Sequence, residues 1–349
     1  MLEWQNKWNP FNSYKALVHV KYWESIKDGK IPPPLFLSID PSGFCNLKCR
    51  HCNAAEVLSQ NKAMMTTGLM DTVIQCGNMA GTMAYCIAGG GEPLMNKDLG
   101  HLLNGLVRGN KQVAVLTNGL LIPNHAAELL KCTYVGISVD AATNKTWKKV
   151  KGPATRTIED VFKGISLLTG RGLEVTYKYL LLPDNAGEVY AACKRAKELG
   201  CNQFHLRPGS RPWFGGKKYI FTDAARTLVA GQLARAREEL EDESFRIYSV
   251  THKFKDDWSV LKSFKKCYAC YTTAFVSPDG TMGLCCDRRG DDAVVLGNIR
   301  DFDGLWGGAR HKEIQEKINV ASCPRCTCTG INEIFENVII KDKTLYNLF

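Results

Sequence analysis

Residues 44–52 have the sequence FCNLKCRHC, in which Cys45, Cys49 and Cys52 supply three thiols within eight residues. They follow a short apolar segment at residues 35–40 (LFLSID), which predicts a buried strand. One short loop with three thiolates can hold three irons of a [4Fe–4S] cube. The fourth iron then stays open for a ligand that the protein does not supply. This loop therefore predicts an iron–sulfur site directly after the first strand.

The chain that follows alternates short apolar segments with longer amphipathic ones. The predicted strands lie at residues 35–40, 84–88, 112–116, 134–139, 173–181 and 203–206. The predicted helices lie at residues 66–79, 97–108, 122–131, 157–170 and 186–199. Such alternation indicates an α/β fold with a parallel sheet covered by helices. Spacing alone does not distinguish a barrel from a doubly wound sheet, but both bind ligands at the carboxyl ends of their strands.

Polar and glycine-rich segments follow these predicted strands one after another. They are Asp40 with the cysteine loop, residues 89–93 (GGGEP), residues 117–119 (TNG), Asp140, residues 183–185 (PDN) and Arg207. The carboxyl ends of parallel strands meet at one side of such a fold. We therefore expect these segments to build a single site.

These motifs, in this order, resemble the radical S-adenosylmethionine (SAM) superfamily over residues 35–210. The resemblance rests on FCNLKCRHC after the first predicted strand, GGGEP after the second, LTNG after the third and SVD at the fourth. It implies a partial (β/α)6 barrel of the TIM type. It also implies a [4Fe–4S] cluster held by Cys45, Cys49 and Cys52, with SAM on the open iron. An external electron donor such as flavodoxin or ferredoxin would reduce the cluster, and SAM cleavage would yield a 5′-deoxyadenosyl radical that abstracts a substrate hydrogen.

The resemblance further implies cofactor contacts in the GGGEP loop and beside the last cysteine. Gly90, Gly91 and Glu92 correspond to the loop that receives the methionine ammonium group of SAM. Glycine allows close approach of the backbone, and a carboxylate suits an ammonium group. His51 stands at a position that is usually aromatic and lies near the adenine, where a histidine can still stack or form a hydrogen bond.

Other cofactor contacts are implied at the later strand ends. Ser138 and Asp140 resemble residues near the ribose hydroxyls of SAM. Lys151 stands where many relatives have an arginine that meets the SAM carboxylate; lysine keeps the charge but loses the bidentate geometry. A helix cap or a solvated charge is the alternative role for these three side chains. The complete set of cofactor-binding candidates is His51, Gly90, Gly91, Glu92, Asn118, Ser138, Asp140, Lys151 and Arg207.

A second group of cysteines lies near the end of the chain. Cys270 is followed after nine residues by Gly280, and after four more by Cys285; Cys323 and Cys326 come later, two residues apart. The intervening segment predicts a hairpin that turns at residues 278–280 (PDG). This arrangement resembles the twitch and SPASM extensions of radical SAM enzymes, which hold auxiliary iron–sulfur clusters. We predict the shorter twitch form, with one auxiliary [4Fe–4S] cluster on these four cysteines. Cys267, Cys286 and Cys328 are the alternative ligands.

Zinc is the competing explanation for both cysteine groups. In the first group His51 is the nearest candidate for a fourth ligand, but no fourth cysteine has the usual spacing. In the second group Cys267 with Cys270, and Cys323 with Cys326, have a spacing that is typical of zinc sites. A zinc site there would leave the match around Gly280 unexplained.

Composition constrains where the protein acts and what it meets. The net charge of +10 favours anionic partners, although it also serves solubility. No segment has the length and apolarity of a membrane helix, and the N-terminal residues lack the apolar core of a secretory signal, so we expect a cytoplasmic protein. The basic residues are not clustered, so we expect no nucleic-acid partner. The predicted parts are an N-terminal extension (1–34), the radical SAM barrel (35–220), a bridging helix and linker (221–263), and a small hairpin-plus-helix cluster-binding module (264–349).

The sequence predicts the reaction type more sharply than the substrate. We expect hydrogen abstraction followed either by oxidation, with the auxiliary cluster's help, or by epimerisation. Epimerisation needs a hydrogen donor, and Cys86, near the end of the second predicted strand, is the candidate catalytic thiol. A sugar, aminocyclitol or nucleotide-linked sugar is the expected substrate, and a ribosomally made peptide is the alternative. A non-enzymatic iron–sulfur or zinc protein is the second alternative.

Metal analysis tests the two-cluster hypothesis. Anaerobically reconstituted protein is expected to contain roughly eight irons per chain, because two cubes hold four irons each. Replacing Cys45, Cys49 and Cys52 together by alanine is expected to leave about four. A total of about four irons that vanishes in the triple variant would contradict an auxiliary cluster.

Overall fold

The computed structural model describes residues 11–209, 219–250, 262–323 and 326–340, and its strands form one continuous sheet. The strand order is β10-β9-β8-β1-β2-β3-β4-β5-β6-β7. Neighbours from β8 through β1 to β7 are parallel, whereas β9 and β10 are antiparallel additions. The strands are β1 (Phe36–Ile39), β2 (Ala84–Ile87), β3 (Gln112–Thr117), β4 (Tyr134–Ser138), β5 (Glu174–Leu181), β6 (Gln203–Pro208), β7 (Arg246–Ser249), β8 (Thr273–Val276), β9 (Thr281–Gly283) and β10 (Val295–Asn298).

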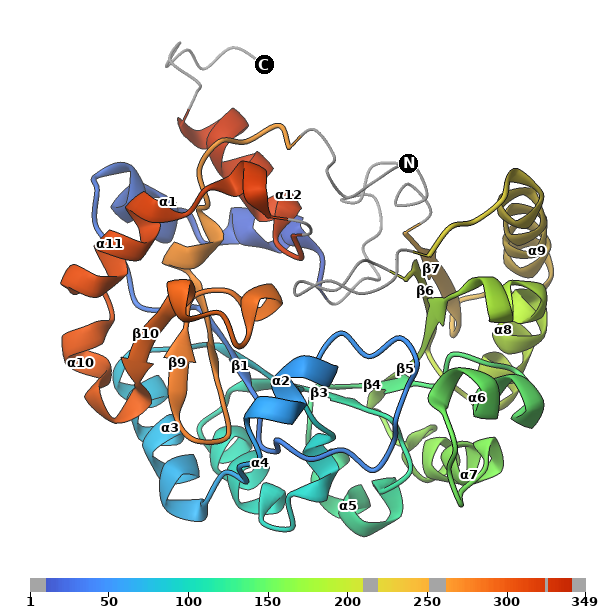
Figure 1. Ribbon diagram of the computed structural model, residues 1–349. Coiled ribbons are helices and arrows are strands. Elements are labelled where there is room, and N and C mark those ends of the chain that lie inside the picture. The colour runs from blue at the N-terminus through green and yellow to red at the C-terminus, as the bar shows by residue number, and fades with distance from the viewer. Residues whose placement is uncertain (1–10, 210–218, 251–261, 324–325, 341–349) are drawn as a thin grey trace.

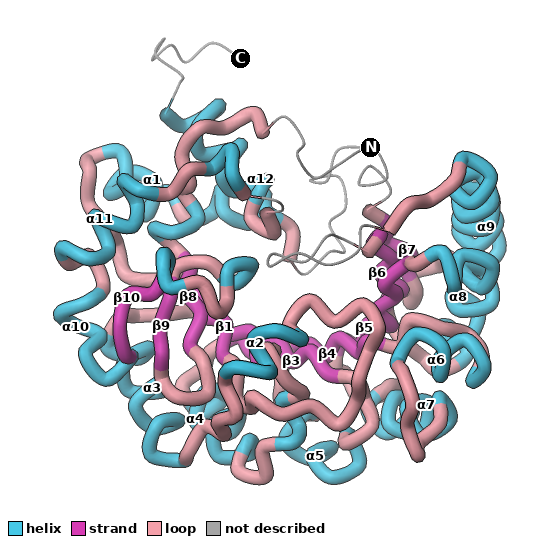
Figure 2. The backbone as a smooth tube through the Cα atoms, in the orientation of Figure 1, coloured by secondary structure: helices cyan, strands magenta, loops and turns pink. Residues whose placement is uncertain are grey.

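The sheet curves into a partial barrel with helices on its outside, as Figures 1 and 2 show. This confirms the predicted barrel, and each predicted strand lies within two residues of an observed one. The helices are α1 (Val20–Lys27), α2 (Ala55–Gln60), α3 (Thr67–Met79), α4 (Leu99–Arg108), α5 (Ile122–Leu129), α6 (Asn144–Lys151), α7 (Ile158–Leu168), α8 (Val189–Glu198), α9 (Asp223–Leu240), α10 (Phe302–Leu305), α11 (Ala309–Lys317) and α12 (Thr329–Ile334).

Alternation along each strand separates an apolar outer face from a more polar inner face. Tyr85 points outward, since a Cβ added at Gly77 of α3 would lie 1.7 Å from its hydroxyl oxygen. Ile137 also points outward, towards Val161 of α7 and the loop at Gly119. Successive residues of a strand point to opposite faces. The residues that alternate with these, including Ser38, Cys86 and Lys178, therefore face the barrel interior.

The segment predicted as a bridging helix and linker (221–263) contributes to the barrel itself. This segment contains α9, which packs against α8 through buried Val229, Leu233 and Ala236. The next strand, β7, pairs in parallel with β6 and extends the barrel sheet. α9 therefore completes the sixth βα unit of the barrel, although its mixed surface charge makes its narrow apolar stripe hard to recognise in the sequence.

The C-terminal hairpin is also part of the barrel sheet. β8 and β9 form the predicted antiparallel pair, but β8 pairs in parallel with β1, with Ser38 opposite Phe275. The N-terminal extension reaches the same region, because the rings of Trp23 in α1 and Phe335 have centroids 4.9 Å apart. The second cysteine group is therefore held directly beside the first strand of the barrel.

Two glycines of α3 provide a matched test of the outer packing. Gly77→Ala is expected to lower the free energy of unfolding by about 1–3 kcal/mol, because the methyl group collides with Tyr85. Gly68→Ala adds a methyl group in open space and is expected to raise it by up to about 1 kcal/mol. Urea unfolding followed by circular dichroism measures both. Equal effects of the two substitutions would contradict the assigned outward position of Tyr85.

Candidate functional site

The cysteine loop after β1 is tied to the GGGEP loop after β2 by backbone hydrogen bonds. Gly91 N donates to Ser42 O at 3.1 Å, and Glu92 N donates to Phe44 O at 2.8 Å. A Cβ at Gly91 would lie 2.2 Å from the oxygen of Phe44, so only glycine permits this approach. The predicted convergence of these two loops is therefore present in the structure.

The thiols of Cys45, Cys49 and Cys52 fit an iron–sulfur ligand set. Burial raises the pKa of Cys45 to about 11, with smaller contributions from Glu92 and the other two cysteines. Burial also raises the pKa of Cys49 and of Cys52, and the nearby ammonium of Lys151 opposes both rises. Ligand thiols must lose their protons, so cluster binding at this loop is coupled to proton release. A buried cation next to the three thiols suits the thiolate form.

The described residues contain no group of three or more His, Cys, Asp or Glu side chains arranged around one metal ion. A [4Fe–4S] cube makes a different demand, because its thiolates bind separate irons and stand further apart.

The Glu92 carboxylate connects the GGGEP and TNG loops. Its Oε1 accepts from the Thr117 hydroxyl at 2.6 Å, and its Oε2 accepts from Asn118 N at 2.8 Å. The Asn118 amide in turn donates to Asn46 Oδ1 at 2.7 Å, within the cysteine loop. Burial raises the pKa of Glu92, whereas these hydrogen bonds oppose the rise. The side chain thus holds the loops together, and its predicted contact with SAM stays a prediction.

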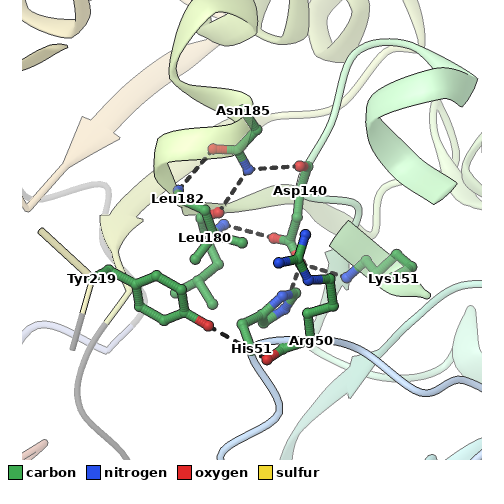
Figure 3. A network of polar contacts seen from close by, with 8 residues as sticks. All are labelled: Arg50, His51, Asp140, Lys151, Leu180, Leu182, Asn185 and Tyr219. Atoms are coloured by element: carbon green, nitrogen blue, oxygen red, sulfur yellow. Dashed lines mark hydrogen bonds and ion pairs between the residues drawn. The ribbon is translucent and has the colours of Figure 1, made fainter. Parts of the chain in front are cut away.

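Asp140 is the centre of a buried polar network next to the cysteine loop (Figure 3). Its Oδ2 receives the Lys151 ammonium and lies 3.4 Å from His51 Nε2. Its Oδ1 accepts from Leu180 N at 2.6 Å, and its carbonyl accepts from the Asn185 amide at 2.8 Å. Burial would raise the pKa of Asp140, but Lys151 and His51 hold it well below its ordinary value. The network joins the first cysteine group to β4, β5 and α6.

Two details of this network bear on the predicted cofactor contacts. His51 Nδ1 is buried and has no hydrogen-bond partner within the described part of the chain, so it fits the predicted contact with a bound adenine. Lys151 is only 2% exposed and already paired with Asp140. Gly152, which follows it, has φ +81°, and a Cβ there would lie 2.4 Å from Lys48 O. The end of α6 is therefore packed directly on the cysteine loop.

The remaining predicted contacts lie on the inner face of the barrel or near its rim. Ser138 ends β4 in register with Lys178 of β5, and Arg207 lies near the end of β6 opposite Leu180. Lys178 is not among the site residues predicted from the sequence, because one lysine in an apolar strand carries no motif. Neither is Tyr219, whose hydroxyl donates to Arg50 O at 3.5 Å (Figure 3).

The second cysteine group gathers around Cys267 rather than Cys270. Burial raises the pKa of the Cys285 thiol, and Cys267 contributes to that rise, as it does for Cys323 and Cys326. Cys270 is 1% exposed, and its thiol donates to the carbonyl of Cys267 at 2.9 Å. The thiols of Cys267 and Cys270 contact each other, but Cys267 is the one that affects Cys285, Cys323 and Cys326, which favours Cys267, one of the three alternatives, over Cys270 as the first auxiliary ligand. Burial raises the pKa of the Cys328 thiol, and Cys286, Cys326 and Cys285 add to the rise, so Cys328 also lies near the group.

One buried ion pair joins the two cysteine groups. Arg289, three residues after Cys286, donates from Nε to Asp40 Oδ2 at 2.6 Å and from a terminal nitrogen to the Ser38 hydroxyl at 2.6 Å. It also donates to the carbonyl of Cys286 at 2.6 Å, and Asp40 accepts from Gly90 N at 3.3 Å. A direct chain of contacts thus runs from the C-terminal cysteines to the GGGEP loop.

Comparisons with known proteins agree with this architecture. Residues 39–196 match the model of the radical SAM superfamily, and residues 267–328 match the SPASM model, described as an iron–sulfur cluster-binding domain. The chain therefore belongs to the radical SAM superfamily and carries a SPASM domain. The first domain implies a [4Fe–4S] cluster with SAM, and the second implies auxiliary iron–sulfur binding. The SPASM match begins at Cys267 and ends at Cys328.

Three similar proteins illustrate the range of relatives. The antilisterial bacteriocin subtilosin biosynthesis protein AlbA of Bacillus subtilis (strain 168) is 28% identical over 50% of this chain and 39% of AlbA. The AdoMet-dependent heme synthase of Methanosarcina barkeri (strain Fusaro) is 26% identical over 79% of this chain and 83% of the relative. The crystal structure of Streptococcus suis SuiB has a TM-score of 0.67 at 16% identity over 91% of this chain and 77% of SuiB, a likeness of fold.

The chain matches only about 37–55% of the length of AlbA and of several further curated relatives.

Within the described residues, no helix is both long and apolar enough to span a membrane.

The two neighbouring cysteines give a direct test of the auxiliary ligand set. Cys267→Ser is expected to remove about four irons per chain, because its thiol lies among the other clustered thiols. Cys270→Ser is expected to retain them, because that thiol is directed at a backbone carbonyl. Iron and sulfide analysis of anaerobically reconstituted protein measures both. Loss of iron in Cys270→Ser alone would restore the ligand set predicted from sequence.

Proposed function

We propose that this protein is an enzyme that takes a hydrogen atom from a substrate held inside the barrel, between its two cysteine groups. The observation that carries this proposal is the Arg289–Asp40 ion pair, with a distance of 2.6 Å. It connects the SPASM domain to the end of β1, where the radical SAM loop begins. When bound, a [4Fe–4S] cluster with SAM would supply the carbon radical, and an external donor such as flavodoxin or ferredoxin the electron.

The proposed roles of this chain's residues follow from their positions. Cys45, Cys49 and Cys52 would hold the cluster, and the backbone of Gly90 and Gly91 would approach the SAM ammonium group. His51 Nδ1, which has no partner within the described residues, would contact the adenine. The further proposed cofactor contacts are Glu92, Asn118, Ser138, Asp140, Lys151 and Arg207. For the auxiliary site, we propose Cys267, Cys285, Cys323 and Cys326, with Cys270, Cys286 and Cys328 as alternatives.

Cys86 has the position expected of a hydrogen donor. It lies on the inner face of β2, 6% exposed, beside Ser38 of β1 in register. Burial raises the pKa of its thiol to about 12, whereas Lys178 and Arg289 oppose the rise. The thiol therefore stays protonated near neutral pH and could give its hydrogen atom to a substrate radical, after which the external electron donor and a proton would restore the thiol from the thiyl radical. This would give epimerisation, whereas electron transfer to the auxiliary group would give net oxidation.

We propose a ribosomally made peptide as the substrate class. The support is that AlbA acts in the biosynthesis of the bacteriocin subtilosin and that SuiB has been solved with its precursor peptide SuiA. The second candidate is a sugar, aminocyclitol or nucleotide-linked sugar, and of these the net charge of +10 favours the anionic nucleotide-linked form. A peptide that binds the purified protein tightly would favour the first class.

Chromatography of SAM products tests the proposed activity. Dithionite-reduced protein is expected to convert SAM to methionine and 5′-deoxyadenosine, and Cys45→Ala is expected to abolish this by removing a cluster ligand. Cys132→Ala, which changes a buried thiol in the loop between α5 and β4, is the control that should retain it. Cleavage that survives in Cys45→Ala would overturn the proposal. With a substrate that turns over in D2O, Cys86→Ala is expected to remove solvent deuterium from the product if the reaction is an epimerisation.

A further inference from the structure

A lysine is built into the interior of the barrel, away from every motif used above. Lys178 lies on the inner face of β5, with Ser138 of β4 and His205 of β6 as its register partners. A Cβ added at Gly136 would lie 2.8 Å from Lys178 Cδ. Glycine at this inward position of β4 therefore leaves the space that the aliphatic part of the lysine occupies.

The Lys178 ammonium has no carboxylate partner within ion-pair distance among the residues that the structure describes. Asp140, the acid that most affects it, already binds Lys151, His51 and Leu180 N. The ammonium instead lies 5.9 Å from the ring centroid of Phe11. Lys178 is half-buried, so its charge has lost part of its hydration without gaining a carboxylate partner, and a ligand of opposite charge would relieve that cost.

Positive charge also dominates the surroundings of Lys178. Burial, followed by nearby Arg207, lowers the pKa of Lys178 to about 8. The two carboxylates at the ends of β1 and β4 already form ion pairs, Asp40 with Arg289 and Asp140 with Lys151. The interior therefore has a cation for which the described residues supply no counter-charge.

We propose that Lys178 binds an anionic oxygen group of the substrate, either a carboxylate or a phosphate, inside the barrel. Lysine supplies a point charge that suits both groups. Cys86 is close enough to interact with Lys178, so an anion held there would bring the substrate beside that thiol. The identification of this ligand as the substrate rests on the proposed function, whereas anion binding itself can be measured without turnover.

Calorimetric titration of the anaerobically prepared holoprotein tests the site with two probes, glutarate and inorganic phosphate. The wild type is expected to bind at least one of them, and the preferred probe distinguishes a carboxylate from a phosphate ligand. Lys178→Met is expected to weaken that binding at least about tenfold, whereas Lys178→Arg keeps the charge and should retain most of it. Lys194→Met removes the same charge from an exposed position of α8 and should leave binding unchanged. Equal binding by wild type and Lys178→Met, or no binding by the wild type, would overturn the proposal.

A second measurement does not depend on the folding of a variant. Reductive methylation of the wild-type holoprotein, followed by mass spectrometry, reports the reactivity of each lysine. The preferred anion is expected to protect Lys178 and not Lys194; no protection of Lys178 would count against the site. SAM cleavage is measured on the same preparation. Anion binding without SAM cleavage would overturn the proposed function alone, and SAM cleavage without anion binding would overturn only the anion site.

Discussion

The buried carboxylate of Asp140 is the interaction on which the first site depends. It takes up the Lys151 ammonium at the end of α6, lies 3.4 Å from His51 in the cysteine loop and accepts from the backbone of β5. Removing one partner of such a buried pair typically costs about 3–5 kcal/mol, because the other charge stays behind without compensation. The residue has φ +62°, a backbone conformation that non-glycine residues rarely adopt. The surrounding hydrogen bonds hold it there, and the cysteine loop takes its position from them.

A second buried carboxylate, that of Asp40, positions the C-terminal cysteines. Asp40 ends β1 and binds Arg289, which also contacts the backbone of Cys286. The two pairs lie at the ends of β1 and β4, on the side of the barrel where the radical SAM loops gather. Each pair holds one cysteine group against the sheet. The barrel interior between these two pairs contains the thiol of Cys86 and the ammonium of Lys178. Neither side chain belongs to the two cysteine groups.

Much of this architecture could be predicted from local sequence. The strands have outward residues such as Leu37 and Val135 that are fully buried, and short apolar segments of this kind are visible without a structure. The cysteine loop and the GGGEP segment were found because their residue types are rare in that spacing. Shorter or more polar elements are not predicted from the sequence. One example is α6, which carries several lysines along a helix of eight residues. Its Trp147 and Lys151 are recognised as buried only once the helix packs on the barrel.

The sequence by itself determined the class of chemistry, because three closely spaced cysteines and a glycine-rich acidic loop are local patterns with a chemical meaning. It also determined the alternation of strands and helices, since hydrophobic periodicity is local. Only the tertiary structure decided that β8 joins β1, that Cys267 lies near Cys285, Cys323 and Cys326, and that Arg289 reaches Asp40. These contacts join residues up to 249 positions apart along the chain. They depend on burial and on charges brought together by packing, which no local pattern records.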